Sequence, residues 1–597
     1  MPLRKSQKIS FLAVLYFFLA KIHQIIGNTK KYHYLCGKFF VMRRLLILLI
    51  CIFETLLASA QIEKFNAQPP KHEVRAVWIT TIGGLDWPHS YAQSERSAEK
   101  QKLELCNILD RLQRAGINQV LLQTRIRATT IYPSAYEPWD GCLSGFPGKS
   151  PGYDALAFAV DECHKRGIEL HAWVVTMPVG KWNALGCKKL RQRFPGLITK
   201  IGPDGYMNPE KPQTAKYLAD ICQEIARKYD VDGIHLDYIR YPEEWKMRVS
   251  EEQGRRYITQ IVKAIHDRIK PLKPYLKLSC SPIGKFNDLT RFWSHGWNAY
   301  SRVCQDAQGW LRDGLMDELI PMMYFQGEQF FPFALDWSEN TYGKIVASGL
   351  GIYFMSPNEK DWPLNVITRE MEVLRQVHIG HAYFRSKFFT DNEKDIYNYT
   401  TNWFDNTLAL VPPMTWESSQ KPERPINLKM KDNRLFWQPA DSTEKNIMYN
   451  VYSSRSYPVE ISDARNLVVV NSRKSEIAIP EEDELRYYAI TSITRYGIES
   501  NALQLQLPSS STSGRNIRML SCNGYQLKNP PHDPQSDAEM LIIEDLKGKH
   551  VSTFLWKNGP SDVSHIEEGM YQLRSLNRHG ITHHLGFFNI KRDSLME

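Results

Sequence analysis

The sequence predicts a (β/α)8 barrel of the TIM type followed by one or two small β-sandwich domains. Short apolar runs alternate with amphipathic helical segments from Glu73 onward, eight of each can be counted, and the pattern changes to short alternating runs beyond Phe404. Such alternation is typical of a parallel sheet with crossover helices, and eight units close a barrel. A doubly wound open sheet is the alternative, but no Gly-rich phosphate loop follows the first strand.

The predicted strands are short apolar runs, as expected for strands that are covered on both faces. They are Val74–Thr80, Gln119–Thr124, Ile168–Val175, Gly233–Ile239, Leu276–Ser281, Leu319–Tyr324, Ile345–Phe354 and Ala382–Phe388. The predicted helices carry apolar residues at helical spacing and end near Gly or Pro. They are Glu95–Ala115, Asp154–Arg166, Thr214–Tyr229, Glu251–Lys270, Cys304–Gly314, Phe333–Tyr342, Leu364–Val377 and Glu393–Phe404. The barrel domain is therefore placed at residues 70–408.

Beyond the barrel, proline content and strand spacing predict separate β domains. Val411–Pro425 holds four prolines and is interpreted as a linker. Residues 424–508 alternate apolar and polar side chains, which predicts a small β-sandwich. Pro508–Gly514 is rich in Ser and predicts a flexible second linker. Residues 516–597 contain further strand candidates, so we expect a second small β module there.

The first 60 residues are predicted to be a leader that contains a signal peptide. Met42 and two arginines precede the apolar run Leu45–Phe53, and Ala58-Ser59-Ala60 follows it as a small-residue cleavage site. We therefore expect translation to start at Met42 and the mature chain to be extracytoplasmic, in the periplasm, the cell envelope or outside the cell. The earlier run Phe11–Ala20 is short for a transmembrane helix, so no membrane span is expected in the mature chain.

Composition and charge restrict the class of protein. With 597 residues and 43% hydrophobic residues, the chain can form several cores and is neither disordered nor fibrous. Residues 1–60 hold nine Lys or Arg and one Glu, so the net charge of +10 falls to about +2 without them. A basic surface for nucleic acid is therefore not expected. No metal-ligand spacing is present, so we expect neither metal nor cofactor, and we expect a monomer.

The segment Val231–Pro242 is the strongest functional signal in the chain. It is a predicted buried strand that ends at Asp237, and Pro242 cannot extend a strand ladder. A carboxylate at the C-terminal end of a parallel strand lies where α/β barrels place their chemistry. The alternative is a salt-bridged aspartate of the barrel core.

Motifs in this order along the barrel resemble the glycosyl hydrolase-like 10 family. They are Val74–Thr80, Leu85–Pro88, Gln123–Arg125, Tyr136–Trp139, Pro151–Asp154, His164–Gly167, His171–Trp173 and Asp232–Pro242. The resemblance implies a TIM barrel, an extracytoplasmic location and glycan hydrolysis, and some members act on peptidoglycan strands that lack peptide stems. Many members have two adjacent carboxylates where this chain has Asp237 and Tyr238, so a mechanism that uses the second one is not open to it.

The two C-terminal regions also resemble known modules. Residues 424–508 resemble a fibronectin type III module through Tyr487–Thr491 and Tyr496–Ser500. Residues 516–597 are similar to the β-sandwich sorting domains of the type IX secretion route through Gly569–Leu573. These resemblances imply an exported protein with accessory modules.

Glycoside hydrolysis usually needs one carboxylic acid that protonates the leaving oxygen and one carboxylate that acts as nucleophile or base. Two acids must therefore meet at the barrel mouth. Asp237 is expected as the nucleophile or electrostatic stabiliser, and Glu328, shortly after the sixth strand, as its catalytic partner. The competing loop carboxylates are those of Asp86, Asp140, Glu243 and Glu244.

Substrate contacts are expected from side chains at the strand ends and from aromatic residues, onto which sugar rings can lie. Arg125 could hold Asp237 ionised or bind an acidic sugar, with a structural ion pair as the alternative. His235 should share the face of Asp237, because strand side chains repeat at period two, and it is either a hydroxyl donor or a barrel-interior histidine. The further expected contacts are His171, Trp173, Tyr238, Tyr324 and Trp87.

The sequence thus predicts a glycosidase that cleaves a polysaccharide, with peptidoglycan as a candidate. The single Asp in place of paired acids favours a second hypothesis, in which the barrel is a glycan-binding scaffold of the cell envelope that has lost catalysis.

Overall fold

The computed structural model describes residues 69–294, 296–441, 446–479 and 486–505, and within the C-terminal segment residues 520–523, 526–529, 538–546, 549–556, 559–577 and 582–591. The predicted leader, with Met42 and the cleavage site, lies outside the described residues. The predicted domain boundaries stay predictions.

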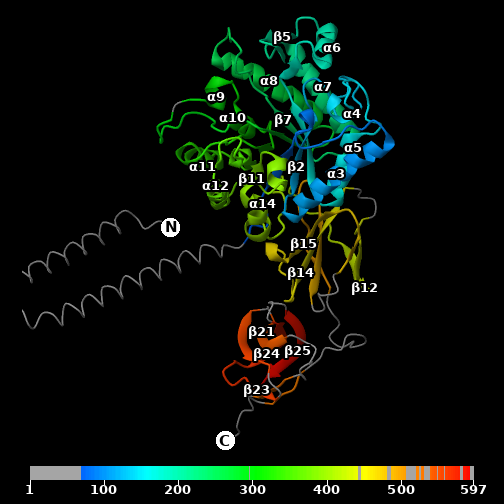
Figure 1. Ribbon diagram of the computed structural model, residues 1–597, viewed down its shortest axis with the longest axis vertical. Helices are drawn as coiled ribbons and strands as arrows, with labels where there is room; N and C mark the ends of the chain where they lie inside the picture. Colours follow the sequence, from blue (N-terminus) through cyan, green and yellow to red (C-terminus); the bar gives the residue numbers. More distant parts are fainter. Residues whose placement is uncertain are drawn as a thin grey trace, which may run out of the picture. The chain divides into compact units, whose positions relative to one another are not determined.

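Within this part of the chain, eight parallel strands close into a barrel in the order β1-β11-β10-β9-β8-β7-β3-β2. The strands are β1 (Arg75–Ile79), β2 (Gln119–Arg125), β3 (Glu169–Val175), β7 (Gly233–Asp237), β8 (Lys277–Cys280), β9 (Glu318–Leu319), β10 (Ile345–Leu350) and β11 (Gly380–Tyr383). Helices surround them, as Figure 1 shows. The predicted fold class is confirmed.

Helices follow most strands and cover the outside of the barrel. They are α3 (Glu95–Arg114), α5 (Ala155–Lys165), α7 (Pro212–Lys228), α8 (Glu251–Ile269), α10 (Ala307–Arg312), α11 (Phe331–Glu339), α12 (Leu364–Gln376) and α14 (Ile396–Tyr399) with η5 (Thr400–Phe404). The shorter helical turns are η1 (Ile82–Gly84), α4 (Gly141–Ser144), α9 (Ala299–Arg302), η2 (Gly327–Gln329), η3 (Ile352–Met355), α13 (Ser386–Thr390) and η4 (Glu393–Asp395). Ser94 caps α3 through a capping box with Ser97, which fixes where this helix begins.

The structure differs from the prediction where apolar sequence continues past the end of a strand. The predicted strand Ile345–Phe354 ends at Leu350 and continues as η3, and Ala382–Phe388 divides into the end of β11 and the helix α13. The loop after β3 is also more regular than expected. It holds β4 (Pro178–Lys181), α6 (Leu185–Arg193), β5 (Ile198–Ile201) and β6 (Asp204–Met207), and its strands form a separate sheet in the order β4-β6-β5.

Apolar side chains fill two layers of the barrel. Outward-facing residues such as Val77, Leu122 and Leu236 pack against the helices, while Trp78 and Trp173 lie in a second cluster inside the barrel. Such double-sided burial explains why the strands read as continuous apolar runs.

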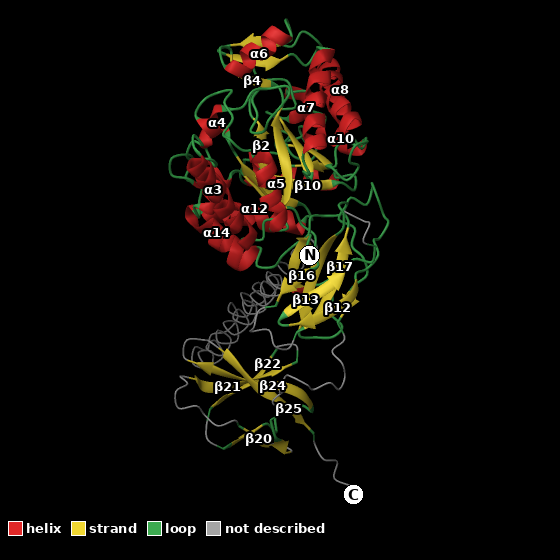
Figure 2. Ribbon diagram, turned by 90° about the vertical axis from the view of Figure 1, so that its right-hand side faces the viewer, coloured by secondary structure: helices red, strands yellow, loops and turns green. Residues whose placement is uncertain are grey.

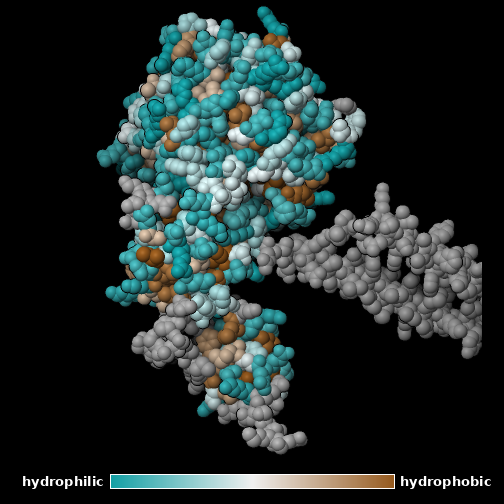
Figure 3. Space-filling view, turned by 180° about the vertical axis from the view of Figure 1, so that it is seen from behind, coloured by the Kyte–Doolittle hydropathy of each residue, from teal (hydrophilic) through white to brown (hydrophobic). Residues whose placement is uncertain are grey.

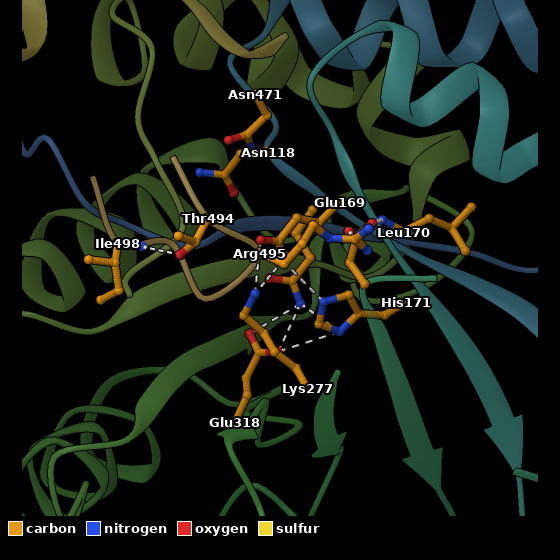
Figure 4. A network of polar contacts seen from close by, with 12 residues as sticks. Asn118, Glu169, Leu170, His171, Lys277, Glu318, Asn471, Thr494, Arg495 and Ile498 are labelled. Atoms are coloured by element: carbon orange, nitrogen blue, oxygen red, sulfur yellow. Dashed lines mark hydrogen bonds and ion pairs between the residues drawn. The ribbon is translucent and has the colours of Figure 1, made fainter. Parts of the chain in front are cut away.

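The N-terminal half of the barrel interior is polar (Figure 4). Lys277 Nζ contacts both carboxylate oxygens of Glu169 at 2.9 Å, and the Gln119 amide donates to Glu318 at 3.0 and 3.1 Å. His171 lies among them and passes close over Gly233, where an added Cβ would lie 2.5 Å from its Nδ1. The glycine of the β7 strand is therefore required by this close approach.

Two antiparallel sheets follow the barrel, in the orders β12-β13-β16 and β15-β14-β17-β18. Their elements are β12 (Ile426–Lys431), β13 (Arg434–Gln438), β14 (Met448–Ser454), η6 (Ala464–Asn466), β15 (Leu467–Ser472), β16 (Glu476–Ala478), β17 (Tyr487–Ile493) and β18 (Leu503–Gln504). Leu435, Trp437, Tyr449 and Val451 are buried between them. Figure 2 shows these strands in yellow.

The C-terminal segment forms two more antiparallel sheets, β19-β20-β23 and β22-β21-β24-β25. Their strands are β19 (Cys522–Asn523), β20 (Gln526–Lys528), β21 (Ala538–Asp545), β22 (His550–Leu555), β23 (Pro560–Asp562), β24 (Gly569–Asn577) and β25 (Thr582–Ile590). Leu541, Leu573 and Phe588 belong to their common core.

The face of the barrel drawn in Figure 3 is predominantly hydrophilic, with small hydrophobic patches. Among the helices that the structure describes, none has both the length and the apolar character needed to cross a membrane.

Candidate active site

Asp237 is the last residue of β7 and is buried, with 7% of its surface exposed. Its Oδ1 accepts hydrogen bonds from the Tyr238 N–H at 2.7 Å and the Ser281 hydroxyl at 3.1 Å. Its Oδ2 accepts one from the Trp173 indole at 3.1 Å. The carboxyl group is thus held from three sides by β7 itself and by the ends of its two neighbouring strands.

Tyr238 leaves the strand in a left-handed conformation with φ of 55°, which is unusual for a bulky residue. This turn directs its N–H back to Asp237, while 36% of the tyrosine is exposed. The Arg240 guanidinium lies 4.1 Å from the centre of the Tyr238 ring. Arg240 in turn donates to Glu243 Oε1 at 2.8 Å, so the turn after β7 brings a second carboxylate into this neighbourhood.

The electrostatics of Asp237 shift its carboxyl group toward the protonated form. Burial raises the pKa of the carboxyl group, and the positive charge of Arg240 and the three hydrogen bonds oppose this only in part. Directly below it, burial lowers the pKa of His235 well below its usual value, so this imidazole is neutral. His235 Nδ1 pairs with Ser279 Oγ at 2.9 Å, and Nε2 has no hydrogen-bond partner in the described part of the chain.

Aromatic rings form one wall near Asp237. Tyr324 packs against Phe384 and Tyr353 with ring centres 5.5 and 5.7 Å apart, and Phe384 also contacts Trp78. Burial raises the pKa of Tyr324 well above its usual value, and the nearby Tyr353 and Asp237 add to this rise. Trp173, Tyr238 and Tyr324 are thus gathered around the carboxyl group.

Three other predicted contact residues lie elsewhere. His171 is fully buried among Glu169, Gln119 and Glu318 in the lower half of the barrel, two register positions before Trp173 on β3. The Arg125 side chain pairs with Glu137 and donates to the carbonyls of Val175 and Thr176. Arg125 thus forms the structural ion pair that was expected from the sequence as the alternative to a role in the site.

Trp87 is also away from the candidate site. None of its surface is exposed, and its indole donates to the Gln101 carbonyl at 2.9 Å. Its ring therefore packs the first loop onto α3 and offers no face to a ligand.

The candidate second acids differ in their surroundings. Glu328 lies in η2 and is exposed, and no hydrogen bond joins it to Asp237. Asp86 is buried against Arg385 at 2.6 Å, and Asp140 caps α4 at Cys142. Glu243 accepts a hydrogen bond from Arg240, whose charge acts on Asp237. Glu244 is exposed.

Sequence reasoning missed Ser281 as part of the site. Ser279 and Ser281 alternate at the end of β8 and both point toward the β7 side chains, one to His235 and the other to Asp237. The period of two in this strand was the signal that could have found them. Among the described residues, no group of three or more His, Cys, Asp or Glu side chains could hold a metal ion.

Part of the barrel, including the strand that ends at Asp237, matches the model of a known family. The family model of glycosyl hydrolase-like 10 matches residues 73–253 and 249–360. The barrel is therefore similar to this family over residues 73–360. The match covers seven of the eight barrel strands, including β7 with Asp237.

Named relatives also resemble this chain. The chain is 29% identical over 405 residues to "Glycosyl hydrolase YngK" of Bacillus subtilis (strain 168), covering 62% of this chain and 79% of that protein. It is 27% identical over 345 residues to "Glycosyl hydrolase DigH" of Escherichia coli (strain K12), covering 50% and 78%.

Solved structures resemble this chain more distantly. Alpha-L-fucosidase isoenzyme 2 from Paenibacillus thiaminolyticus has a TM-score of 0.38 at 15% identity, covering 57% of this chain and 51% of that one. The spore cortex-lytic enzyme SleL of Bacillus megaterium QM B1551 has a TM-score of 0.33 at 9% identity, covering 58% and 76%. At these scores neither bears on the substrate.

Proposed function

We propose that this protein is an extracytoplasmic glycoside hydrolase that cleaves a polysaccharide, with peptidoglycan strands lacking peptide stems as the expected substrate. The proposal is carried by Asp237, a buried and three-fold hydrogen-bonded carboxyl group at the C-terminal end of β7, beside the exposed Tyr238. Two relatives named glycosyl hydrolases support the reaction class. The signal-like sequence before residue 61 supports the location.

The raised pKa of Asp237 suits a proton donor better than a nucleophile, because a general acid must hold its proton near the working pH. In this role Asp237 protonates the leaving glycosidic oxygen. A second carboxylate then stabilises the anomeric carbon or activates water. Glu328 is the partner expected from the sequence, and Glu243, which Arg240 connects to the turn after β7, is its competitor.

Trp173, Tyr238 and Tyr324 are the proposed substrate contacts nearest the acid, since flat rings suit the apolar faces of sugars. His235 is proposed as a neutral group of the layer below, whose unpaired Nε2 can take a hydroxyl that reaches it. Arg125, His171 and Trp87 leave the proposed contact set because their structural partners occupy them.

The two accessory regions are proposed as a fibronectin type III-like module and a secretion sorting module. Their antiparallel sheets and the resemblance of their late strands support these assignments. In this proposal they serve export and spacing, while the barrel acts on the glycan.

The function is tested by incubating the purified protein with stem-free peptidoglycan strands and with other polysaccharides, and by measuring new reducing ends. The Asp237→Asn variant should lose turnover by orders of magnitude and keep the thermal unfolding of the wild type. Glu328→Gln and Glu243→Gln, compared under the same conditions, identify the second acid as the variant that loses turnover. An Asp237→Asn variant of normal activity removes Asp237 from the mechanism.

A glycan-binding scaffold without catalysis is the second candidate function. It is favoured by Tyr238 in place of an adjacent acid and by the exposed position of Glu328, which has no bond to Asp237. Retention of polysaccharide by the wild-type protein without release of reducing ends on any substrate would favour this scaffold.

A further inference from the structure

The two oxygens of the Asp237 carboxyl group have different hydrogen-bond surroundings. Oδ1 accepts two hydrogen bonds, from the Tyr238 N–H and the Ser281 hydroxyl, whereas Oδ2 accepts one, from the Trp173 indole. A carboxylate oxygen has about two acceptor positions. Among the residues that the structure describes, Oδ1 is therefore saturated and Oδ2 keeps one position free.

We propose that Ser281 and Trp173 are positioning residues for Asp237. They orient its carboxyl group so that Oδ2 is the oxygen that reacts with the glycan. The inference rests on the proposed function, because it assigns an atom and two supporting side chains to the same site. Neither Ser281 nor Trp173 exchanges a proton itself. They hold the carboxyl plane, so that its one unsaturated position has a fixed direction.

The proton balance of the step follows from this geometry. The Oδ2–H bond breaks, its proton bonds to the leaving glycosidic oxygen, and that oxygen keeps the electron pair of the broken C–O bond. Water supplies the group that ends on the anomeric carbon, with the second carboxylate as base or nucleophile. Asp237 is left as a carboxylate, and the donors from Tyr238, Ser281 and Trp173 stabilise that charge.

Of the three hydrogen-bond donors to Asp237, the Ser281 hydroxyl is the one whose removal changes the rest of the structure least. It is 2% exposed and follows β8, where its own N–H is bonded to the Leu236 carbonyl at 3.1 Å. Its hydroxyl bonds Asp237 from a strand that is fixed independently, so the Ser281→Ala variant removes one donor and keeps the backbone. Only proline would remove the Tyr238 N–H, and its fixed φ near −65° is incompatible with the φ of 55° at this position.

The other charged and titratable groups near Asp237 do not replace this donor. Arg240 acts on the carboxyl group through its charge, and Tyr238 and Tyr324 are phenols whose pKa values Asp237 helps to raise. The Cys280 thiol responds to Asp237 in the same way. None of these groups donates a side-chain hydrogen bond to the carboxyl oxygens in the described structure.

Ser279 provides a matched control within the same strand. It is fully buried, lies two residues before Ser281, and uses its hydroxyl for His235 at 2.9 Å instead of Asp237. Ser279→Ala and Ser281→Ala therefore remove the same atom from the same strand face, one layer apart. Only Ser281→Ala removes a donor from the Asp237 carboxylate.

The test compares the full-length wild type, S281A and S279A by two measurements. The first is the pH profile of kcat/KM on the polysaccharide, and the second is the titration of the Asp237 carboxyl followed by ¹³C NMR, with Asp237→Asn assigning the signal. Loss of a hydrogen bond to the charged form should raise the pKa of Asp237 by about one pH unit in S281A and leave it in place in S279A. Asp237 then keeps its proton to higher pH, so the alkaline limb of the kcat/KM profile moves to higher pH.

The role of Oδ2 is tested with Trp173→Phe, which frees the second position on that oxygen. We expect kcat to fall about tenfold or more with little change in KM, because the direction of the reacting oxygen is lost while the ring wall remains. Ser281→Thr keeps a hydroxyl and should restore the wild-type titration. If S281A does not fold, Ser281→Cys gives the same comparison with a weak donor.

An equal titration of S281A and the wild type, or an equal shift in S279A, overturns the inference, as does an unchanged kcat for Trp173→Phe. A wild-type protein that releases no reducing ends refutes the proposed function and with it the reacting role of Oδ2. The NMR titration uses no substrate, so it still decides whether Ser281 sets the protonation of Asp237.

Discussion

Arg125 and Glu137 form an ion pair inside the barrel domain, with Nη2 and Oε1 2.7 Å apart and no more than 1% of either side chain exposed. The Tyr217 hydroxyl also donates to Glu137 Oε1, at 3.0 Å. This pair fixes the end of β2 to the loop that follows it, below the loops of the candidate site. A buried charge of this kind is costly to leave without its partner.

The Arg125→Met variant should therefore lose about 3–5 kcal/mol of unfolding free energy, because Glu137 remains buried without its cation. Urea unfolding measures the loss. Arg127→Met, two residues later at an exposed position, is the control and should change stability little. A stable Arg125→Met variant that binds glycan poorly would return Arg125 to the substrate contacts.

Arg495, in the loop after β17, donates to Asp232 at 2.8 Å with 4% of its side chain exposed. Arg495 lowers the pKa of Asp232, as does His164. The stabilisation is therefore present above the unfolded pKa of about 3.9 and is lost as the pH falls further. Arg495→Met should destabilise the protein by about 3 kcal/mol at pH 7 and by progressively less below pH 4.

The control for Arg495 is Arg473→Met, because Arg473 pairs with Asp230 at 2.8 Å but is 42% exposed. Thermal unfolding of both variants between pH 3 and pH 7 measures the difference. Equal effects of the two substitutions would contradict a special contribution of the buried pair.

Glu370, on α12, is fully buried, and neither carboxyl oxygen has a hydrogen-bond partner among the described residues. Burial raises its pKa well above the usual value. Folding is therefore disfavoured as the pH rises above the unfolded pKa of about 4.3. Glu370→Leu should raise the unfolding free energy at pH 7 by roughly 1–3 kcal/mol and gain less at pH 4.

Glu370→Gln separates the two parts of this effect, because it removes the ionisation but keeps an unpaired polar group. It should abolish the contribution of residue 370 to the pH dependence of stability, and it should stabilise the protein less than Glu370→Leu. Urea unfolding at both pH values measures this, and a destabilised Glu370→Leu variant would indicate a partner for the carboxyl group.

Trp87 and Trp173 should respond differently to substitution by Phe. Trp87→Phe loses core contacts and the hydrogen bond to Gln101, so it should cost roughly 1–3 kcal/mol of stability at unchanged kcat/KM. Trp173→Phe should reduce turnover, as argued above. Unfolding and kinetic measurements on both variants give the comparison, and a lower kcat/KM for Trp87→Phe at full folding would contradict it.

Much of the barrel could be predicted from the sequence because its strands are buried on both faces and its helices are amphipathic. Val74–Thr80 and Glu95–Ala115 correspond closely to β1 and α3. One kind of error lies where apolar residues form a short helix after a strand, as in α13. The other lies where a long loop forms its own sheet, as β4, β5 and β6 do. A short apolar run does not reveal whether it extends a strand or packs a turn.

The site was harder to predict than the fold. Strand position placed Asp237 at the mouth, and period two put His235 below it. The same reasoning did not show how deep in the barrel His171 lies, because one strand face runs from the polar lower half to the mouth. Arg125 and Trp87 looked available in the sequence, since their partners Glu137 and Gln101 are set by folding.

The sequence by itself determined the eight-unit barrel, its β-sheet appendages and the acid at the end of β7, because these depend on local periodicity and chain order. Only the tertiary structure decided which side chains meet that acid. Trp173 and Ser281 reach Asp237 from β3 and from the end of β8, and burial there raises the pKa of Asp237. Neighbours across a closed sheet are fixed by register and desolvation, which no single stretch of sequence encodes.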